Sequence, residues 1–183
     1  MSRIYIHQGH SEADSGAVGA DGYQESDFTK AVGEKLAARL TAAGHDACLS
    51  RERLPEAKSG RVAADANEVG ADVVVSIHAN DAGPTARGAE VFIVEGSRRA
   101  RILADACEAA FRAEFPDHRW RGIKPDTETA AGRLTILRDT QAPAFLIEPG
   151  FMSNPDELAW LERDDVQDRI AGVLFTAVTQ RIT

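Results

Sequence analysis

The sequence predicts a single α/β domain with a mostly parallel, twisted sheet of about six strands and helices on both faces. First, short apolar runs alternate with amphipathic segments along the 183 residues, as in chains whose helices connect parallel strands. Second, the mostly β-branched run at 73–77 lacks alternation, which is typical of a strand buried on both faces. Third, no repeat, low-complexity segment or linker divides the chain, so one domain is expected to span 1–183.

The first half of the chain is expected to contain three strands and two helices. The strands are short apolar runs, whereas the helices carry apolar residues three or four positions apart. In order, these elements are a strand at 3–7, a helix from Ser26 or Asp27 to Gly44, a strand at 47–51, a helix at 57–69 and the strand at 73–77. The segment between the first strand and helix, 9–22, is rich in Gly, Ala and Asp. It is predicted to be a long loop, and such loops tend to be functional.

The second half is expected to add three strands and two helices. Pro, Gly, Asp and Thr at 116–133 indicate a loop, and Ser97 is a typical N-cap. The predicted elements are a strand at 88–94, a helix from Ser97 to Phe115, the loop at 116–133, strands at 134–137 and 144–147, and an amphipathic helix from Val166 to Val178.

Composition excludes several classes of function. The net charge of -8 disfavours binding to nucleic acid or an anionic membrane surface, and no apolar run is long enough to span a membrane. Cys48 and Cys107 lie in apolar sequence, which is typical of small buried hydrophobic residues rather than a disulfide. The N-terminus lacks the pattern of a signal peptide. We therefore expect a soluble protein that is made in the cytoplasm.

Polar side chains follow the predicted strands. His10 comes after the first strand, His78 after the central one and Glu148 after the last one, while Glu25 precedes the first helix. Open α/β sheets bind ligands at the carboxyl edge, so these groups are candidates for one site. Two imidazoles and a carboxylate, with one position left for water, are typical of catalytic zinc.

Each candidate also has a simpler interpretation. His10 can be a loop histidine bonded to backbone, His78 a satisfied core histidine, and Glu25 a charge that favours a helix N-terminus by about 0.3–1 kcal/mol. Glu148 follows four apolar residues, so it needs polar partners if it is buried. The remaining histidines are expected to be surface residues or outer contacts, and of these His7 is the one that could lie near the site.

Six features, in order along the chain, resemble one known family. They are GHSEADSGAVG at 9–19, Glu25 at the helix start, SRERLP at 50–55 with Arg61 and Ala66–Asn67, SIHAN at 76–80, Gly88 with Glu90, and LRDTQAPAFLIEPGFMSNPDE at 137–157. Together they resemble the zinc-dependent N-acetylmuramoyl-L-alanine amidases of the type-3 class, which hydrolyse peptidoglycan.

The resemblance implies roles for individual residues. It implies that His10, Glu25 and His78 bind one Zn²⁺ per chain and that Glu148 is the catalytic carboxylate. The reaction would be attack of water on the amide that joins the lactyl group of N-acetylmuramic acid to L-alanine. Two further residues, Asn80 and Glu90, are expected to contact the substrate or support the site.

Two departures from the family pattern lie beside the first histidine. Ser11–Glu12 stand where a further glycine pair is usual, and His7–Gln8 stand where an acidic or small pair is usual. Both leave the ligands intact but alter their surroundings. No insertion is long enough to form a covering helix, so we expect an open site.

The biological setting is left open between two alternatives. Without a leader or a wall-binding repeat, the chain resembles a monomeric phage or prophage lysis enzyme that acts on the cell wall. The alternative is a domain of a secreted bacterial autolysin. Two other functions are a zinc peptidase of the same architecture and a peptidoglycan-binding module without activity.

Overall fold

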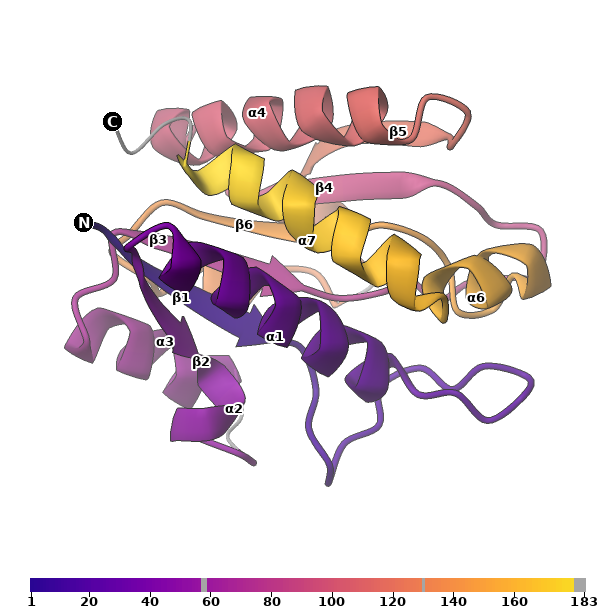
Figure 1. Ribbon diagram of the computed structural model, residues 1–183, viewed down its shortest axis with the longest axis horizontal. Helices are drawn as coiled ribbons and strands as arrows, with labels where there is room; N and C mark the ends of the chain where they lie inside the picture. The colour runs from indigo at the N-terminus through magenta and orange to yellow at the C-terminus, as the bar shows by residue number, and fades with distance from the viewer. Residues whose placement is uncertain (57–58, 130, 180–183) are drawn as a thin grey trace.

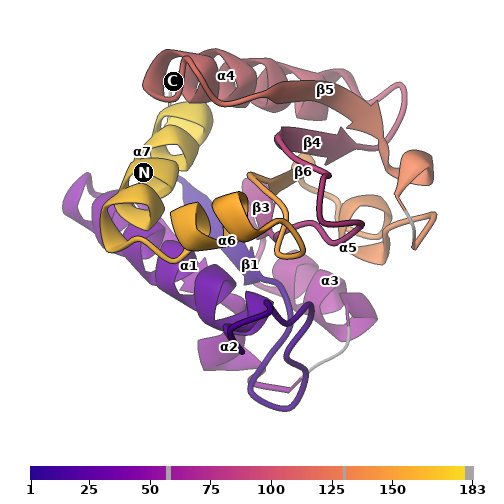
Figure 2. The same cartoon turned by 90° about the vertical axis from the view of Figure 1, so that its right-hand side faces the viewer.

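A six-stranded sheet runs through the molecule, with helices on both of its faces (Figures 1 and 2). The structure is a computed structural model that describes residues 1–56, 59–129 and 131–179. The strands are β1 (Arg3–Gln8), β2 (Asp46–Leu49), β3 (Val73–Ile77), β4 (Ala89–Ile93), β5 (Trp120–Pro125) and β6 (Ala144–Glu148). Their order in the sheet is β2-β1-β3-β6-β4-β5.

Four neighbouring strands, β2, β1, β3 and β6, are parallel, whereas β4 is antiparallel to β6 and β5 is parallel to β4. The prediction of a mostly parallel sheet is therefore confirmed. Every residue of β3 is buried, as the β-branched run predicts for a central strand. Because β1, β3 and β6 are adjacent and parallel, the residues that follow them meet at one edge of the sheet.

Three long helices cover one face of the sheet, namely α1 (Glu25–Ala42), α4 (Arg98–Glu114) and α7 (Asp164–Thr179). In Figure 1, α7 lies between α1 and α4, and both flanking helices pack against it. The larger of two hydrophobic clusters lies between this layer and the sheet, with Phe28, Leu36, Phe111, Phe145 and Leu174 fully buried. The shorter helix α6 (Pro155–Leu161) contributes Leu158 and Leu161 to the same cluster.

The other face is covered by α3 (Ser59–Glu68) and the short α5 (Thr135–Arg138), which pack against each other. A second hydrophobic cluster lies beneath them and includes Tyr5, Val74, Phe92 and Leu146 of the sheet. Helices on both faces are thus confirmed. The predicted helix at 57–69 corresponds to α3, although its first two residues lie outside the described part of the chain. The described residues contain no helix that is both long and apolar enough to cross a membrane.

The prediction of a strand at 134–137 was wrong, because these residues lead into and form α5. The buried Asp126 carboxylate accepts a hydrogen bond from the backbone N–H of Leu134 (3.0 Å) and two from Arg138 (2.6 and 2.7 Å). Both ends of the segment are thereby drawn to one carboxylate, which favours a tight helical turn over an extended strand. Ile136 and Leu137 are buried in the second cluster.

The strand that brings the total to six is β5, which lies within 116–133. The prediction of a continuous loop over 116–133 was therefore wrong as well. β5 is a half-buried edge strand that contains Gly122 and ends at Pro125, and edge strands tolerate both residue types. Its register against β4 slips by one residue at Arg121, which forms a bulge. Two short helices, α6 and α2 (Ser50–Arg53), were not predicted, and residue 130 lies outside the described residues.

Candidate active site

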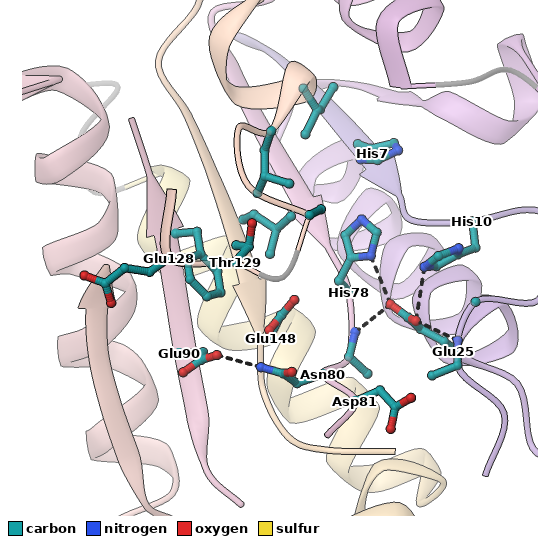
Figure 3. A pocket seen from close by; sticks show the side chains of 18 of the residues that line it. His7, His10, Glu25, His78, Asn80, Asp81, Glu90, Glu128, Thr129 and Glu148 are labelled. Carbon is teal, nitrogen blue, oxygen red and sulfur yellow. Dashed lines mark hydrogen bonds and ion pairs between the residues drawn. The ribbon is translucent and has the colours of Figure 1, made fainter. Parts of the chain in front are cut away.

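Four predicted site residues come together at the carboxyl edge of the parallel strands (Figure 3). His78 follows β3 directly, His10 lies two residues beyond β1, Glu148 is the last residue of β6, and Glu25 is the first residue of α1. All four line one cavity of about 690 Å³. The sheet order and the long loop at 9–22 therefore bring together side chains that are up to 138 positions apart in sequence.

Three of these residues form a cluster with the geometry of a metal site. Nε2 of His10 lies 3.1 Å from one oxygen of Glu25, and Nδ1 of His78 lies 2.9 Å from the other. One donor atom from each residue lies within 4.8 Å of the other two. Two imidazole nitrogens and one carboxylate oxygen fit a catalytic zinc ion with a fourth position for water. The donor set and its spacing thus agree with the zinc site implied by the resemblance.

Glu25 is held in place as an ionised carboxylate. Its side chain is 5% exposed, and its two oxygens accept hydrogen bonds from the backbone N–H groups of Ala17 and Ala79, each 3.0 Å long. Burial alone would raise the pKa of Glu25, but hydrogen bonds with His10 and His78 outweigh it and hold that pKa well below its usual range. A negatively charged carboxylate is therefore fixed between the two imidazoles.

The first histidine is oriented by its surroundings. Nδ1 of His10 lies 3.0 Å from the Asp14 carboxylate, so the opposite nitrogen, Nε2, is turned toward Glu25. A carboxylate bonded to the outer nitrogen of a ligand histidine fixes its ring orientation and raises its basicity. His10 also has a positive φ of 64°, which is uncommon for a residue other than glycine.

Two glycines allow the chain to approach this cluster closely. A Cβ atom at Gly9 would overlap the ring of His78, so even alanine would displace that side chain. A Cβ atom at Gly16, where φ is +65°, would lie 2.6 Å from both Glu25 and His10. The glycines of the 9–19 block are therefore needed for the packing of the proposed ligands.

Arg51 holds the loop that carries His10. Its guanidinium donates hydrogen bonds to the carbonyl oxygens of Gly9, His10 and Ser26, and to the hydroxyl of Thr29. The bonds to Ser26 and Thr29 connect the loop to the first turn of α1, next to Glu25. One side chain thus fixes two proposed ligands relative to each other.

We expect Arg51→Ala to weaken zinc binding by about 10–100-fold, the range found when groups that orient metal ligands are removed. The measurement is the zinc dissociation constant from competition with a chelator. Arg53→Ala is the matched control, because Arg53 belongs to the same short helix but pairs with Asp65, away from the cluster. The control is expected to lower the free energy of unfolding and leave zinc affinity unchanged. Equal zinc affinity in both variants and the wild type would contradict the role of Arg51.

Glu148 lies in the same cavity and has an unusual protonation behaviour. Burial raises the pKa of its carboxyl to about 8, and the nearby charges of Glu90 and Glu25 act in the same direction. Lys124 and Arg121 oppose the shift, but both cations are bonded to Glu90, each at 2.6 Å. A carboxyl group with a pKa near neutral is suited to accept and return a proton.

Asn80 and Glu90 line the same cavity as Glu148. This position is compatible with the expectation that they contact the substrate or support the site. Glu90 pairs with Glu148 across β4 and β6, and one of its oxygens accepts a 2.6 Å hydrogen bond from the amide of Asn80. The other oxygen of Glu90 accepts hydrogen bonds from Arg121 and Lys124. With both oxygens bonded and only 3% of its surface exposed, Glu90 is a fixed negative charge.

His7 also lines the cavity, whereas His118 lies elsewhere. Nδ1 of His7 is 2.8 Å from the hydroxyl of Ser76, and its ring is 5.6 Å from that of His78. Burial lowers the pKa of His7 well below its usual value, so the ring is neutral. His118 stacks on Trp160 instead. The expectation that His7 lies near the site is confirmed.

Sequence reasoning did not find the part of the cavity wall that comes from residues 128–129 and 131–136. It includes Glu128, Thr129 and Arg133, together with the apolar side chains of Leu134 and Ile136. Its position depends on the buried Asp126–Arg138 ion pair, and neither the spacing nor the type of these residues indicates that pairing in advance. The His10 and His78 side chains are 23% and 20% exposed, so the cluster is accessible to solvent.

The protonation of Glu148 gives a testable pH dependence of stability in the metal-free protein. Because its folded pKa of about 8 exceeds its ordinary value of 4.5, its contribution to stability is fully present below pH 4.5 and is lost as pH rises to 8. Glutamine does not ionise, so the Glu148→Gln variant does not lose this part of its stability as pH rises. We therefore expect the metal-free variant to be more stable than the wild type at pH 8.5, by up to roughly 4 kcal/mol, with the gap closing by pH 5.

Urea unfolding at both pH values measures this difference. Glu128→Gln is the control, since Glu128 is an exposed carboxylate of the same cavity. It is expected to shift the free energy of unfolding by the same small amount at both pH values. A stability gap for Glu148→Gln that does not change between pH 5 and pH 8.5 would show that Glu148 is not perturbed.

Comparisons with known proteins agree on one family. A sequence profile described as N-acetylmuramoyl-L-alanine amidase matches residues 4–180. The endolysin of Bacillus phage SPP1 is 31% identical over 169 residues, which cover 92% of this chain and 61% of that protein. The chain therefore spans about three fifths of that relative.

Solved structures of amidases resemble the whole chain, and two of them serve as examples. The catalytic domain of CwlV, an N-acetylmuramoyl-L-alanine amidase from Bacillus (Paenibacillus) polymyxa var. colistinus, has a TM-score of 0.89 and 28% identity, and the match covers 100% of this chain and 98% of that one. The N-acetylmuramoyl-L-alanine amidase from Clostridium difficile 630 has a TM-score of 0.90 and 27% identity, with 99% and 96% covered.

Proposed function

The chain belongs to the N-acetylmuramoyl-L-alanine amidase family, and on that basis we propose that it is a zinc-dependent enzyme that releases stem peptides from peptidoglycan. The bond cleaved is the amide between the lactyl group of N-acetylmuramic acid and L-alanine. The observation that carries the proposal is the convergence of His10, Glu25 and His78 on one point, in the same cavity as Glu148.

His10, Glu25 and His78 would hold the zinc ion, since their donor atoms match its preferred ligands in type and number. Bound zinc supplies Lewis acidity, which polarises a carbonyl group and makes water more acidic. The Asp14 and Arg51 contacts would keep His10 in its coordinating orientation during turnover.

Glu148 performs the proton transfers in this proposal. Its carboxylate takes a proton from the attacking water and then donates that proton to the nitrogen of L-alanine as the amide bond breaks. Burial and the neighbouring Glu90 and Glu25 charges favour the protonated form of Glu148, which supports its holding the proton between the two steps. Glu90 remains ionised beside it, since hydrogen bonds with Lys124 and Arg121 outweigh the effect of burial and lower its pKa.

Product analysis of purified sacculi tests the reaction. The proposed activity releases intact stem peptides with new N-terminal alanine amino groups and leaves free lactyl groups on the glycan. New reducing sugar ends would indicate a glycosidase instead, and free terminal amino acids would indicate the zinc peptidase considered above. Binding to sacculi without any release would indicate a module that recognises the wall and lacks activity.

We also propose that the protein acts as a monomer in phage or prophage lysis, a setting supported by its similarity to the SPP1 endolysin. Expression inside a bacterium that carries a susceptible wall tests this setting. Cells are expected to stay intact until their membrane is permeabilised and then to lyse rapidly. Wall damage without permeabilisation would favour an exported autolysin. Sedimentation of the purified protein measures its oligomeric state.

A further inference from the structure

A single arginine, and no lysine, is found among the described residues that line the cavity. This residue is Arg133, and its side chain is exposed. The cavity is otherwise rich in acidic groups, which belong to Glu25, Asp81, Glu90, Glu128 and Glu148. Within this lining, the positive charges that could attract a substrate carboxylate are the proposed metal and Arg133.

The backbone around Arg133 is fixed, although its side chain is exposed. The next residue, Leu134, donates its N–H to the Asp126 carboxylate, which is fully buried and also paired with Arg138. On the other side, the Thr129 hydroxyl lies within hydrogen-bond distance of the carbonyl oxygens of Asp126 and Gly132, at 2.9 and 2.8 Å, and can donate to either. Arg133 is thus attached to a backbone that is held by hydrogen bonds on both sides, so the backbone loses little further freedom when the guanidinium binds a ligand.

Two other cations close to Glu90, Arg121 and Lys124, are paired with its carboxylate. Arg121 and Lys124 each donate to the same oxygen of Glu90 at 2.6 Å, and neither is among the residues that line the cavity. Releasing either one would leave the buried Glu90 carboxylate short of a partner, which is costly. Arg133 therefore remains as the candidate for binding an anionic part of the substrate.

We propose that Arg133 binds the α-carboxylate of the second stem-peptide residue and so determines which peptidoglycans the enzyme prefers. The inference rests on the proposed function. In the muramoyl peptide, L-alanine is followed by D-glutamate joined through its side-chain carboxyl, which leaves the α-carboxyl either free or, in some walls, amidated. A guanidinium binds a carboxylate through two parallel hydrogen bonds, whereas a neutral carboxamide offers one acceptor and no charge.

The test uses two substrates that differ in this group alone. Uncross-linked glycan strands are prepared with either a free α-carboxylate or a carboxamide at the second stem residue, and stem-peptide release is measured. We expect Arg133→Gln to raise KM about tenfold on the carboxylate substrate and to change it less than about twofold on the carboxamide, with kcat unchanged. Arg133→Lys is expected to raise KM on the carboxylate substrate less than Arg133→Gln does, because lysine keeps the charge but lacks the paired donors.

Arg98→Gln is the matched control, since it makes the same change in net charge. Arg98 is exposed at the start of α4, after the end of β4 that is remote from Glu148, because β4 runs antiparallel to β6. The control is expected to leave KM unchanged on both substrates. If Arg133→Gln changes KM equally on both substrates while stem-peptide release is retained, the proposed role of Arg133 is overturned and the proposed function is not. Failure of the wild type to release peptide from either substrate would overturn the proposed function and this inference with it.

Discussion

Glu148→Gln is expected to lower kcat by about 10²–10⁴-fold, the range associated with loss of a general acid–base group, while zinc content stays at the wild-type level. Glutamine keeps the size and shape of the side chain but cannot take a proton from water at neutral pH. The proposed metal cluster consists of His10, Glu25 and His78 and does not include Glu148. Stem-peptide release and metal content, measured on the same preparation, separate the two effects.

The exposed Glu128 again supplies the control for this variant. Glu128→Gln also removes a carboxylate from the cavity, but it leaves Glu148 at the end of β6 unchanged. This variant is expected to retain wild-type kcat. Loss of zinc together with activity in Glu148→Gln would mean that Glu148 is a ligand rather than the proton carrier. Full activity in this variant would remove Glu148 from the mechanism.

Glu25→Ala and His78→Ala are each expected to abolish zinc binding and to lower activity by about 10³-fold or more, because a Lewis acid stabilises the transition state by several kcal/mol. Glu25→Ala should also reduce the free energy of unfolding. It leaves the N–H groups of Ala17 and Ala79 without the carboxylate that they bond in the wild type. Metal analysis and urea unfolding measure the two effects.

His7→Gln is the control for the histidine variant. His7 lines the same cavity, and its ring is 5.6 Å from that of His78, but its contact is with Ser76 and not with Glu25. It is expected to retain zinc. Chelation followed by zinc addition should restore the wild type and leave Glu25→Ala inactive. Retention of one zinc per chain by either ligand variant would place the ion elsewhere.

The proposed metal cluster and Glu148 could be found from sequence because they depend on local patterns. A β-branched run followed by His78 marks the end of a central strand, and an apolar run followed by Glu148 marks the end of its neighbour. Parallel strands that are adjacent in the sheet bring such endings together. The resemblance added the roles implied for these residues, Glu25 included, and the order of the blocks, which spacing alone does not supply.

The errors lie where distant residues decide the local structure. Residues 134–137 have the composition of a strand, but the carboxylate of Asp126 draws the segment into a helical turn. Gly122 and Pro125 indicate a loop, yet pairing with β4 extends this segment as the edge strand β5. Both effects depend on partners that short-range periodicity does not reveal, so Arg133 and its part of the cavity wall were missed as well.

Anomalous diffraction at the zinc edge, from crystals grown with one equivalent of zinc, tests the central claim most directly. The predicted result is one strong peak per chain, at about 2.0–2.2 Å from a nitrogen of His10, a nitrogen of His78 and an oxygen of Glu25, with Glu148 nearby but not bonded. A peak bonded to other residues, or no peak despite a cleavage-competent protein, would contradict the claim.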